Sequence, residues 1–373
     1  MDALMLPLNW QKVRLGDIGK PCMCKRVMKH QTTRYGEIPF YKIGTFGNTA
    51  DAFISKKLFL EYKTKYSFPK KGDILISASG TIGRAVIYDG KPAYFQDSNI
   101  VWIDNDETLV KNDFLFYAYS NVKWNTEHTT ILRLYNDNFR NTLIPLPSLN
   151  EQSAIANILS GLDRYFCALD ALILKKEGVK KSLSFELLSQ RKRLKGFNQA
   201  WQRVRLGDIA NYLTSNLSVE QITQQGEIKV YDVNNFIGYT DTTFISDKPY
   251  ISIVKDGSVG RVRILPPKTN ILSTMGALIA NHRTTTEFLF YLLSNFDFKN
   301  FTSGSIIPHI YFKDYKEKTI FLPPLNEQSA IANILSALDN EIASLKNKKR
   351  QFENIKKALN HDLMSAKIRV LEK

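Results

Sequence analysis

Two stretches of the chain place apolar residues three and four positions apart over about 40 residues each, which is roughly 60 Å of helix at ~1.5 Å per residue. This spacing puts the apolar side chains on one face of an α-helix. Gly178 interrupts the first pattern and is expected to mark a bend or a break. The apolar positions are Ile155, Leu159, Leu162, Phe166, Leu169, Ile173, Val179, Leu183 and Leu187 in the first stretch, and Ile331, Leu335, Leu338, Ile342, Leu345, Phe352, Ile355, Leu359 and Leu363 in the second.

Prolines stand directly before both stretches, where a helix is expected to begin. Asn150 and Asn326 are predicted N-caps, because a short side-chain oxygen can accept an otherwise unpaired backbone N–H. Glu151 and Glu327 would then lie at the positive end of the helix dipole. Neither helix can bury its apolar face alone, so the two are expected to pack against each other.

Shorter patterns between the helices predict mixed α/β domains. Runs of β-branched and aromatic residues bounded by turn residues indicate strands. Strands are predicted at residues 73–79, 228–231 and 250–254, and short helices at residues 114–119 and 288–293.

The chain is internally duplicated. Residues 149–163 are LNEQSAIANILSGLD and residues 325–339 are LNEQSAIANILSALD, which differ only at Gly161 against Ala337. Residues 10–18 are WQKVRLGDI and residues 201–209 are WQRVRLGDI, which differ only at Lys12 against Arg203. Chance does not produce both matches in the same order, whereas the segments between them differ, and the first is about fifteen residues longer.

The duplication divides the chain into four parts: a globular domain (1–148), a long helix (149–196), a second globular domain (197–324) and a second long helix (325–373). Because a whole domain lies between the helices, an antiparallel pair is the natural geometry. The predicted fold class is α+β, with two mixed α/β domains separated by two long antiparallel helices that form a coiled coil, in a pseudo-two-fold internal repeat.

Composition indicates a soluble globular protein: 43% of the 373 residues are hydrophobic, and no unbroken apolar run is long enough to span a bilayer. The segment MDALMLPLNW lacks the pattern of a secretory signal, so we expect a cytoplasmic protein without membrane contact. Cys22, Cys24 and Cys167 do not make a disulfide framework. Cys22 and Cys24 have no second pair to complete a metal site, and no bound metal is expected.

The net charge of +15 favours a polyanionic partner, with a solvated basic surface as the alternative. Lysines of the long helices are expected to form a solvated face, or in part to lie over DNA. These lysines are Lys175, Lys176, Lys180, Lys181, Lys192, Lys346, Lys348, Lys349, Lys356 and Lys357. Lys349 falls on the apolar face and is expected to extend its amine outward.

A Gly-x-x-Gly-Arg sequence follows a predicted strand in each half. Such a pair of glycines is commonly a plain turn. Here it occurs at a matching place in both halves, glycine lets a backbone approach phosphate closely, and arginine can pair with phosphate or guanine. We therefore predict DNA contact, with phosphate favoured over base, by Gly80, Thr81, Gly83, Arg84, Gly257, Ser258, Gly260 and Arg261.

Catalytic signatures are not found. The sequence has no G-x-G-x-x-G, no G-x-x-x-x-G-K-[ST] and no H-E-x-x-H, and Pro266-Pro267 lacks the neighbours that an amino-methyltransferase would need. The five histidines lack ligand spacing. The main interpretation is a DNA-binding protein without catalysis. The alternatives are a DNA-binding methyltransferase or nuclease fusion with its own catalysis, and a structural protein that only dimerises other subunits.

Over its whole length, the chain resembles the specificity subunits of type I restriction–modification enzymes. The likeness depends on the Trp-to-LGDI segments, the LP-x-LNEQ segments with Pro147 and with Pro323-Pro324, the helix ends Val179–Leu183 and Ile355–Leu359, the two Gly-x-x-Gly-Arg loops, and Thr302-Ser303-Gly304-Ser305. The first half lacks a matching TSGS, and Thr129–Ile131 is only a weak counterpart.

This resemblance implies two target-recognition domains, each contacting one half of an interrupted, asymmetric DNA site, and adds Ser303, Gly304 and Ser305 to the predicted DNA contacts. It implies a subunit without chemistry of its own, which binds two copies of an adenine-N6 methyltransferase (modification) subunit in a complex with ATP-dependent restriction subunits. S-adenosylmethionine, ATP and Mg²⁺ are then expected on the partners, not on this chain. The expected scaffold residues are Asn150, Glu151, Gln152, Asn326, Glu327 and Gln328.

Overall fold

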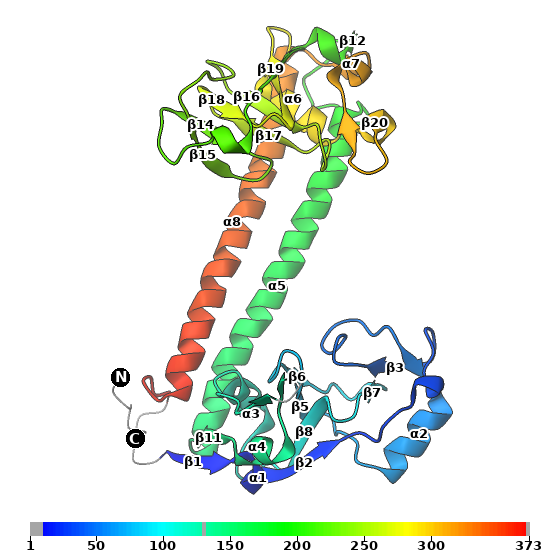
Figure 1. The fold of residues 1–373 in the computed structure, drawn as a ribbon, viewed down its shortest axis with the longest axis vertical. Coiled ribbons are helices and arrows are strands. Elements are labelled where there is room, and N and C mark those ends of the chain that lie inside the picture. The colour runs from blue at the N-terminus through cyan, green and yellow to red at the C-terminus, as the bar shows by residue number, and fades with distance from the viewer. Residues whose placement is uncertain (1–9, 129–131, 371–373) are drawn as a thin grey trace. The chain divides into compact units, whose positions relative to one another are not determined.

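The computed structural model describes residues 10–128 and 132–370 (Figure 1). The chain divides into two compact units, residues 1–168 with 348–373 (unit 1) and residues 169–347 (unit 2). Each unit holds one globular domain, the beginning of one long helix and the end of the other.

Both predicted long helices are present, as α5 (Leu149–Leu188) and α8 (Leu325–Met364). The predicted break at Gly178 is wrong, because α5 is continuous through that residue. A glycine inside a helix costs only roughly 0.5–1 kcal/mol relative to alanine. Apolar contacts on both sides of Gly178, at Ile173 and Leu187, outweigh that cost.

The predicted caps are also wrong, by two residues in each helix. The first helical residues are Leu149 and Leu325, so Asn150 and Asn326 lie in the first turn. At α5, the Ser148 Oγ accepts a hydrogen bond from the Glu151 N–H at 3.3 Å. Asn326 Oδ1 instead accepts the N–H of its neighbour Glu327 at 2.9 Å.

In each unit, the start of one long helix packs antiparallel to the end of the other. In unit 1, Ile155 and Leu159 of α5 share a core with Leu363 of α8. In unit 2, Ile331 and Leu335 of α8 share a core with Leu187 of α5. Most predicted apolar positions are buried or half-buried, and the exceptions are Val179 and Ile355, which are 45% and 54% exposed.

The remaining elements of unit 1 alternate short strands with short helices. They are β1 (Gln11–Arg14), α1 (Leu15–Ile18), β2 (Gly19–Met23), η1 (Lys29–Gln31), β3 (Ile38–Tyr41), β4 (Phe53–Ile54), α2 (Lys56–Lys65), β5 (Ile74–Ser77), β6 (Ala85–Ile87), β7 (Tyr94–Phe95), β8 (Ile100–Asn105), α3 (Asn112–Tyr119), β9 (Glu127–His128), β10 (Leu132–Arg133), α4 (Asn136–Asn141) and β11 (Leu143–Leu146).

Unit 2 repeats this order with two differences: it has no counterpart of α2, in keeping with its shorter variable region, and it has an additional 3-10 turn, η4, after α6. Its elements are β12 (Gln202–Arg205), η2 (Leu206–Asp208), β13 (Ala210–Thr214), η3 (Val219–Gln221), β14 (Ile228–Tyr231), β15 (Phe236–Thr240), β16 (Tyr250–Val254), β17 (Val262–Leu265), β18 (Thr269–Ile271), β19 (Met275–Ala280), α6 (Thr286–Ser294), η4 (Lys299–Phe301), β20 (Thr302–Ser303), β21 (His309–Ile310), α7 (Phe312–Tyr315) and β22 (Thr319–Leu322).

The two domains have the same sheet topology. Each has an antiparallel four-stranded sheet, in the order β2-β8-β5-β6 in unit 1 and β13-β19-β16-β17 in unit 2. Each also has a mixed three-stranded sheet, β4-β3-β7 and β15-β14-β18, whose second pair is parallel. The predicted strands at 73–79, 228–231 and 250–254 correspond to β5, β14 and β16, and the predicted short helices to α3 and α6, so the predicted α+β fold is confirmed.

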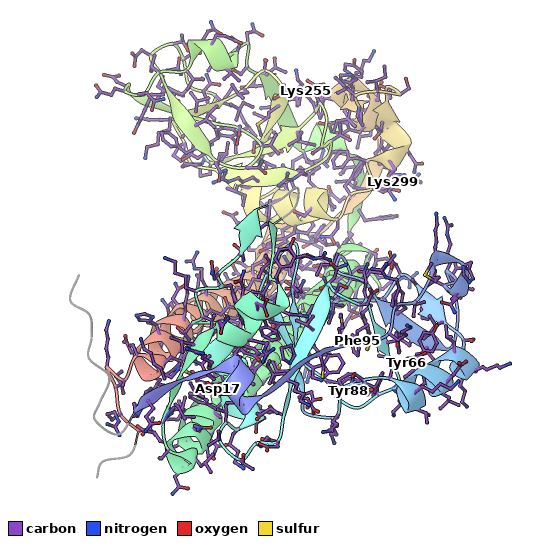
Figure 2. All side chains as sticks on the ribbon, turned by 60° about the horizontal axis from the view of Figure 1, so that its bottom comes forward. Asp17, Tyr66, Tyr88, Phe95, Lys255 and Lys299 are labelled. Atoms are coloured by element: carbon purple, nitrogen blue, oxygen red, sulfur yellow. The ribbon has the colours of Figure 1, made fainter. Side chains whose placement is uncertain are left out.

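Two cores stabilise the domain of unit 1. The main core joins the four-stranded sheet and α3 to the long helices, through residues such as Ile76, Phe114 and Leu159. A second, aromatic core fills the space around the three-stranded sheet, where Tyr88 and Phe95 meet edge to face with ring centres 5.6 Å apart (Figure 2). No helix within residues 10–128 and 132–370 is long and apolar enough to cross a membrane.

Candidate DNA interface and its scaffold

The two duplicated sequence segments lie side by side in each unit. Strand β1, which follows Trp10, pairs antiparallel with β11, which leads into α5. Strand β12, which follows Trp201, pairs in the same way with β22, which leads into α8. The tryptophan segment and the LNEQ segment therefore form one joint, and this joint occurs twice.

A buried glutamate stands at the centre of the joint in unit 1. Glu151 is 2% exposed and accepts a hydrogen bond from the Trp10 indole Nε1 at 3.0 Å. The guanidinium of Arg369, beyond the end of α8, donates to both carboxylate oxygens at 2.7 and 3.1 Å. The two-pronged contact satisfies a charge that would be costly to bury unpaired.

The same arrangement recurs in unit 2. Glu327 is 1% exposed, accepts from Trp201 Nε1 at 3.0 Å, and is held by the Arg193 guanidinium at 3.2 and 2.7 Å. Arg193 lies beyond the end of α5. Each glutamate therefore links three parts of its unit. These are the start of the domain, the start of one long helix, and the segment that follows the end of the other long helix.

The glutamine of each LNEQ segment is fully buried and joins the long helix to the domain. Gln152 donates to the carbonyls of Leu109 and Pro147 and accepts the Lys111 N–H, at 2.8–2.9 Å. These contacts fix the segment that enters α3. Gln328 does the same before α6, donating to the carbonyls of Arg283 and Pro323 and accepting from the Thr284 hydroxyl and the Thr285 N–H.

A third duplicated contact joins the short domain helix to both long helices. In unit 1, Tyr117 of α3 donates to Asp163 of α5 at 2.7 Å, and Lys356 of α8 pairs with the same carboxylate. In unit 2, Tyr291 of α6 donates to Asp339 of α8 at 2.9 Å, and this carboxylate pairs with a lysine of α5, Lys180. The expectation of a solvated lysine face is therefore wrong for Lys180 and Lys356.

Both phenols remain protonated donors. Burial and then the hydrogen-bonded carboxylate raise the pKa of Tyr117 and of Tyr291 well above the usual range. We expect Tyr291→Phe to lower the free energy of unfolding by about 1–2 kcal/mol, because it removes a hydrogen bond to a charged acceptor and little else. Urea unfolding measures this change. Tyr135→Phe, at an exposed tyrosine, is the control and should change little; equal effects of the two variants would contradict the role of Tyr291.

The two Gly-x-x-Gly-Arg loops have the same backbone structure. The Gly83 N–H donates to the Ser77 carbonyl at 2.9 Å, as the Gly260 N–H donates to that of Val254. Both glycines of each loop adopt a positive φ, which favours glycine. The central Ile82 and Val259 are half-buried against the main cores, whereas Thr81 and Ser258 are exposed.

The two glycines of each loop have different roles. A Cβ at Gly83 would lie 2.0 Å from Trp124 Nε1, and a Cβ at Gly260 would lie 2.6 Å from the Phe298 ring. The second glycine therefore lets an aromatic side chain close the inner side of the loop. The first glycine, Gly80 or Gly257, is exposed, so only this one leaves the backbone open to a phosphate.

A small hairpin stands beside the loop in each unit. In unit 2, β20 pairs with β21, and this hairpin contains the predicted Ser303, Gly304 and Ser305, all exposed. It joins the loop through the Gly257 N–H to the Pro308 carbonyl at 2.9 Å and through His309 Nδ1 against Asp256 Oδ1 at 2.6 Å. The predicted DNA contacts of the second half are thus brought together.

In unit 1, the hairpin consists of β9 and β10, and Thr129–Ile131 between them lies outside the described residues. The Leu134 N–H donates to the Ala78 carbonyl at 2.9 Å, as Ile310 does to Lys255 in unit 2. Arg133 Nη2 and Ser79 Oγ meet at Asn99 Oδ1, at 3.0 and 2.8 Å, where unit 2 has the Asp256–His309 contact.

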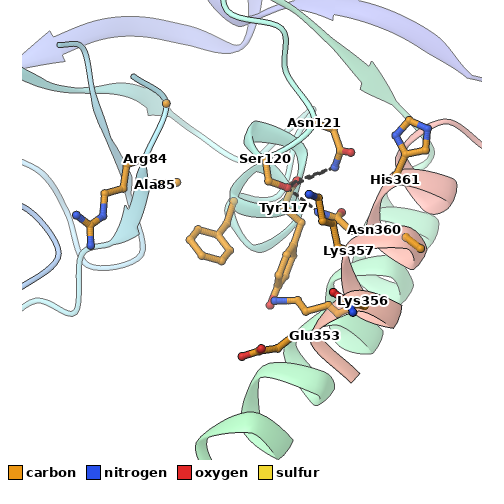
Figure 3. Close-up of a pocket in the computed structure, with 14 residues that line it drawn as sticks. Arg84, Ala85, Tyr117, Ser120, Asn121, Glu353, Lys356, Lys357, Asn360 and His361 are labelled. Atoms are coloured by element: carbon orange, nitrogen blue, oxygen red, sulfur yellow. Dashed lines mark hydrogen bonds between the residues drawn. The ribbon is translucent and has the colours of Figure 1, made fainter. Parts of the chain in front are cut away.

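Arg84 and Arg261 are both exposed. The Arg84 guanidinium lies over Gly47, where a Cβ would be 3.2 Å from its Nε. Arg84 and Gly83 also line one side of an open groove of about 1010 Å³, and Lys356, Lys357 and His361 of α8 line the other (Figure 3). In unit 2, a groove lined by Lys180 and Lys181 occupies part of the matching place, but its lining residues do not include the Gly260–Arg261 loop. Lys356 and Lys180 are already paired with Asp163 and Asp339, so the exposed Lys357 and Lys181 are the lysines that could meet an anionic backbone.

Several residues of the interface and scaffold are absent from the sequence-based prediction. They are Trp124, Phe298, Asp163, Asp339, Arg193 and Arg369. The last four could have been found in the sequence. Asp163 and Asp339 are separated by the same number of residues as Leu149 and Leu325, and so are Arg193 and Arg369. Trp124 and Phe298 differ in type and give no such signal.

Within residues 10–128 and 132–370, no three His, Cys, Asp or Glu side chains form a group that could hold a metal ion. Burial raises the pKa of Cys24 to about 12, so this thiol is a poor ligand.

Sequence comparison finds the same duplication. Residues 7–176 and 198–354 each match the family model of the type I restriction modification DNA specificity domain. A Haemophilus influenzae protein assigned as a type I restriction enzyme specificity subunit is 63% identical over 148 residues, 39% of this chain and 38% of that relative. The specificity subunit of the Methanocaldococcus jannaschii type I restriction enzyme MjaVIII is 25% identical over 99% of this chain and 95% of its own.

Solved structures share the fold. The S subunit of a type I restriction–modification system from M. genitalium superposes with a TM-score of 0.63 over 97% of this chain and 98% of that chain, at 19% identity. A chain from a study of complex assembly in a type I R-M system gives a TM-score of 0.57 over 96% and 98%, at 16% identity. At these identities the likeness concerns the fold.

Proposed function

Because the chain belongs to the type I restriction–modification DNA specificity family, we propose that it recognises a bipartite, asymmetric DNA site and holds methyltransferase subunits on that site. The observation that carries the proposal is the paired loop and hairpin in each unit, which present an exposed arginine beside exposed glycine and hydroxyl groups. The two copies have the same backbone structure but different side chains. This difference supports the recognition of two different half-sites. The net charge of +15 supports binding to double-stranded DNA.

Partners supply the chemistry in this proposal. Membership of a specificity family supports a non-catalytic role for the chain. Two modification subunits would bring adenine-N6 methylation with S-adenosylmethionine, and restriction subunits would bring ATP- and Mg²⁺-dependent activity, in the cytoplasm. Exposed apolar residues of the long helices, such as Leu172, Leu174 and Phe185, are candidate contacts for the modification subunits.

We test the proposal by co-expressing the chain with its modification subunit and mapping methylated adenines across the genome. An interrupted asymmetric motif that depends on this chain is the expected result. Methyl transfer by the purified chain alone would favour the fused-enzyme alternative. DNA binding without any sequence preference would contradict the proposal.

We expect Arg84→Ala to weaken contact at one half-site and Arg261→Ala at the other. If each arginine pairs with phosphate, the slope of log K against log salt falls by ~1 and sequence preference persists. If each pairs with a base, discrimination at one position relaxes by ~1–3 kcal/mol. Binding titrations of half-site variants at several salt concentrations distinguish the two. Arg164→Ala, an exposed arginine of α5, is the control, and unchanged affinity and preference in both loop variants would remove the loops from the interface.

A further inference from the structure

The hairpin of unit 2 exposes two consecutive isoleucines at its tip. Ile306 is 92% exposed and Ile307 is 54% exposed. Within the described residues, no large hydrophobic side chain is more exposed than Ile306. Single exposed aliphatic side chains are ordinary on protein surfaces, so exposure alone would mean little. The way in which this tip is held distinguishes it.

The hairpin is fixed to the neighbouring loop along its second strand and is constrained at its turn. The Ile310 N–H donates to the Lys255 carbonyl, and the Gly257 N–H donates to the Pro308 carbonyl, each at 2.9 Å. Gly304 has a φ of +90°, and a Cβ there would lie 2.3 Å from the Ile307 carbonyl oxygen, so the turn requires glycine. The isoleucines are therefore presented from a defined position beside the Gly257–Arg261 loop.

The surroundings of the tip suit DNA. Ser303 and Ser305 are exposed hydroxyl groups next to it, and Arg261 is an exposed cation on the adjoining loop. The major groove of B-DNA admits a two-stranded β-ribbon, and the thymine C5-methyl is the one apolar group that a base pair offers there.

We propose that Ile306 is a specificity-determining residue that contacts a thymine methyl group in the half-site recognised by unit 2. The inference rests on the proposed function, because it assumes that unit 2 meets DNA through this loop and hairpin. The serines and the arginine would contact polar base edges and phosphates. Ile306 would cover the thymine methyl group, an apolar contact that a polar side chain does not make favourably.

The test removes one methyl group at a time from the DNA. In the motif obtained by methylation mapping, each thymine is replaced in turn by deoxyuridine, which lacks only the C5-methyl, and the full chain is titrated with each duplex. One position is expected to lose affinity about fourfold, which corresponds to ~0.8 kcal/mol for one buried carbon. In Ile306→Ser, thymine and deoxyuridine should bind equally at that position, whereas Ile306→Val should retain part of the difference.

Ile355→Ser, at another exposed isoleucine, is the matched control and should leave the deoxyuridine penalty intact. The inference is overturned if no thymine methyl contributes, or if its contribution persists in Ile306→Ser. Loss of co-purification with the modification subunit, without a change in DNA discrimination, also overturns it and assigns the tip to a protein contact. All three outcomes leave the mapped motif and the Arg261 result in place, so they are distinct from failure of the proposed function.

Discussion

Glu327→Ala is expected to lower the free energy of unfolding by about 3 kcal/mol. The substitution leaves the buried Trp201 indole without an acceptor and the Arg193 guanidinium without its counter-charge. Breaking a buried ion pair by removing one partner costs roughly 3–5 kcal/mol. Because Arg193 is partly exposed and can gain water, the lower end of that range is the better estimate. Urea unfolding followed by tryptophan fluorescence measures the loss, and hydrogen exchange should localise it to β12 and β22.

Glu341→Ala on the same helix is the matched control. Glu341 pairs with Lys176, but its side chain is 44% exposed, and exposed ion pairs contribute roughly 0–1 kcal/mol. Glu151→Ala should resemble Glu327→Ala and act on β1 and β11. A loss at Glu327 no larger than that at Glu341 would show that the buried glutamate is not the centre of the joint.

A fragment ending at Lys195 is expected to form a two-fold dimer and to direct methylation to an interrupted palindrome. The fragment keeps the first domain and α5 but lacks the end of α8 that covers the start of α5 in unit 1. The end of α5 offers the same groups: Lys180 in place of Lys356, Leu187 in place of Leu363, and Arg193 in place of Arg369. A second copy can therefore supply them, and a closed two-fold dimer is the simplest solution.

The charges of the fragment give a sharp test. Across the dimer, Asp163 of each copy would face Lys180 of the other, so Asp163→Lys should weaken the dimer, and Asp163→Lys with Lys180→Asp should restore it. Light scattering reports the mass, and methylation mapping after co-expression with the modification subunit reports the site. A monomeric fragment, or a methylated site that is still asymmetric, would contradict the prediction.

The duplicated frame of the fold could be predicted from sequence because its signals are local or repeated. Helical spacing from Ile155 to Leu187 predicts α5, and the repeated LNEQ segment predicts its counterpart. The predictions of a cap at Asn150 and of a break at Gly178 were wrong, because both relied on the local preferences of single residues. Ser148 supplies the capping oxygen one residue before the helix, and tertiary packing outweighs the small cost of a helical glycine.

The contacts of the joint could not be predicted, because each joins residues far apart in the chain. Glu151 was placed correctly at a helix start, but its partner Trp10 is 141 residues away and Arg369 is 218 residues away. The sequence predicts a solvated face for the lysines of α5 and α8, because the partner of Lys180, Asp339, lies far from it in the chain. In the same way, Gly83 suggests an open loop until the Trp124 ring is seen against it.

The two glutamate-centred joints also differ in one respect, which concerns chain connectivity. Arg193 and Trp201, which meet at Glu327, are joined by the short stretch 194–200. Arg369 and Trp10 meet at Glu151 in the same geometry, although one stands near the end of the sequence and the other near its beginning. The contacts of the two joints are therefore equivalent, although only one joint is bridged by a short stretch of chain. A circular permutant that links Arg369 to Trp10 through a copy of residues 194–200, and that opens within 194–200, is expected to keep the tryptophan–glutamate–arginine contacts of both joints.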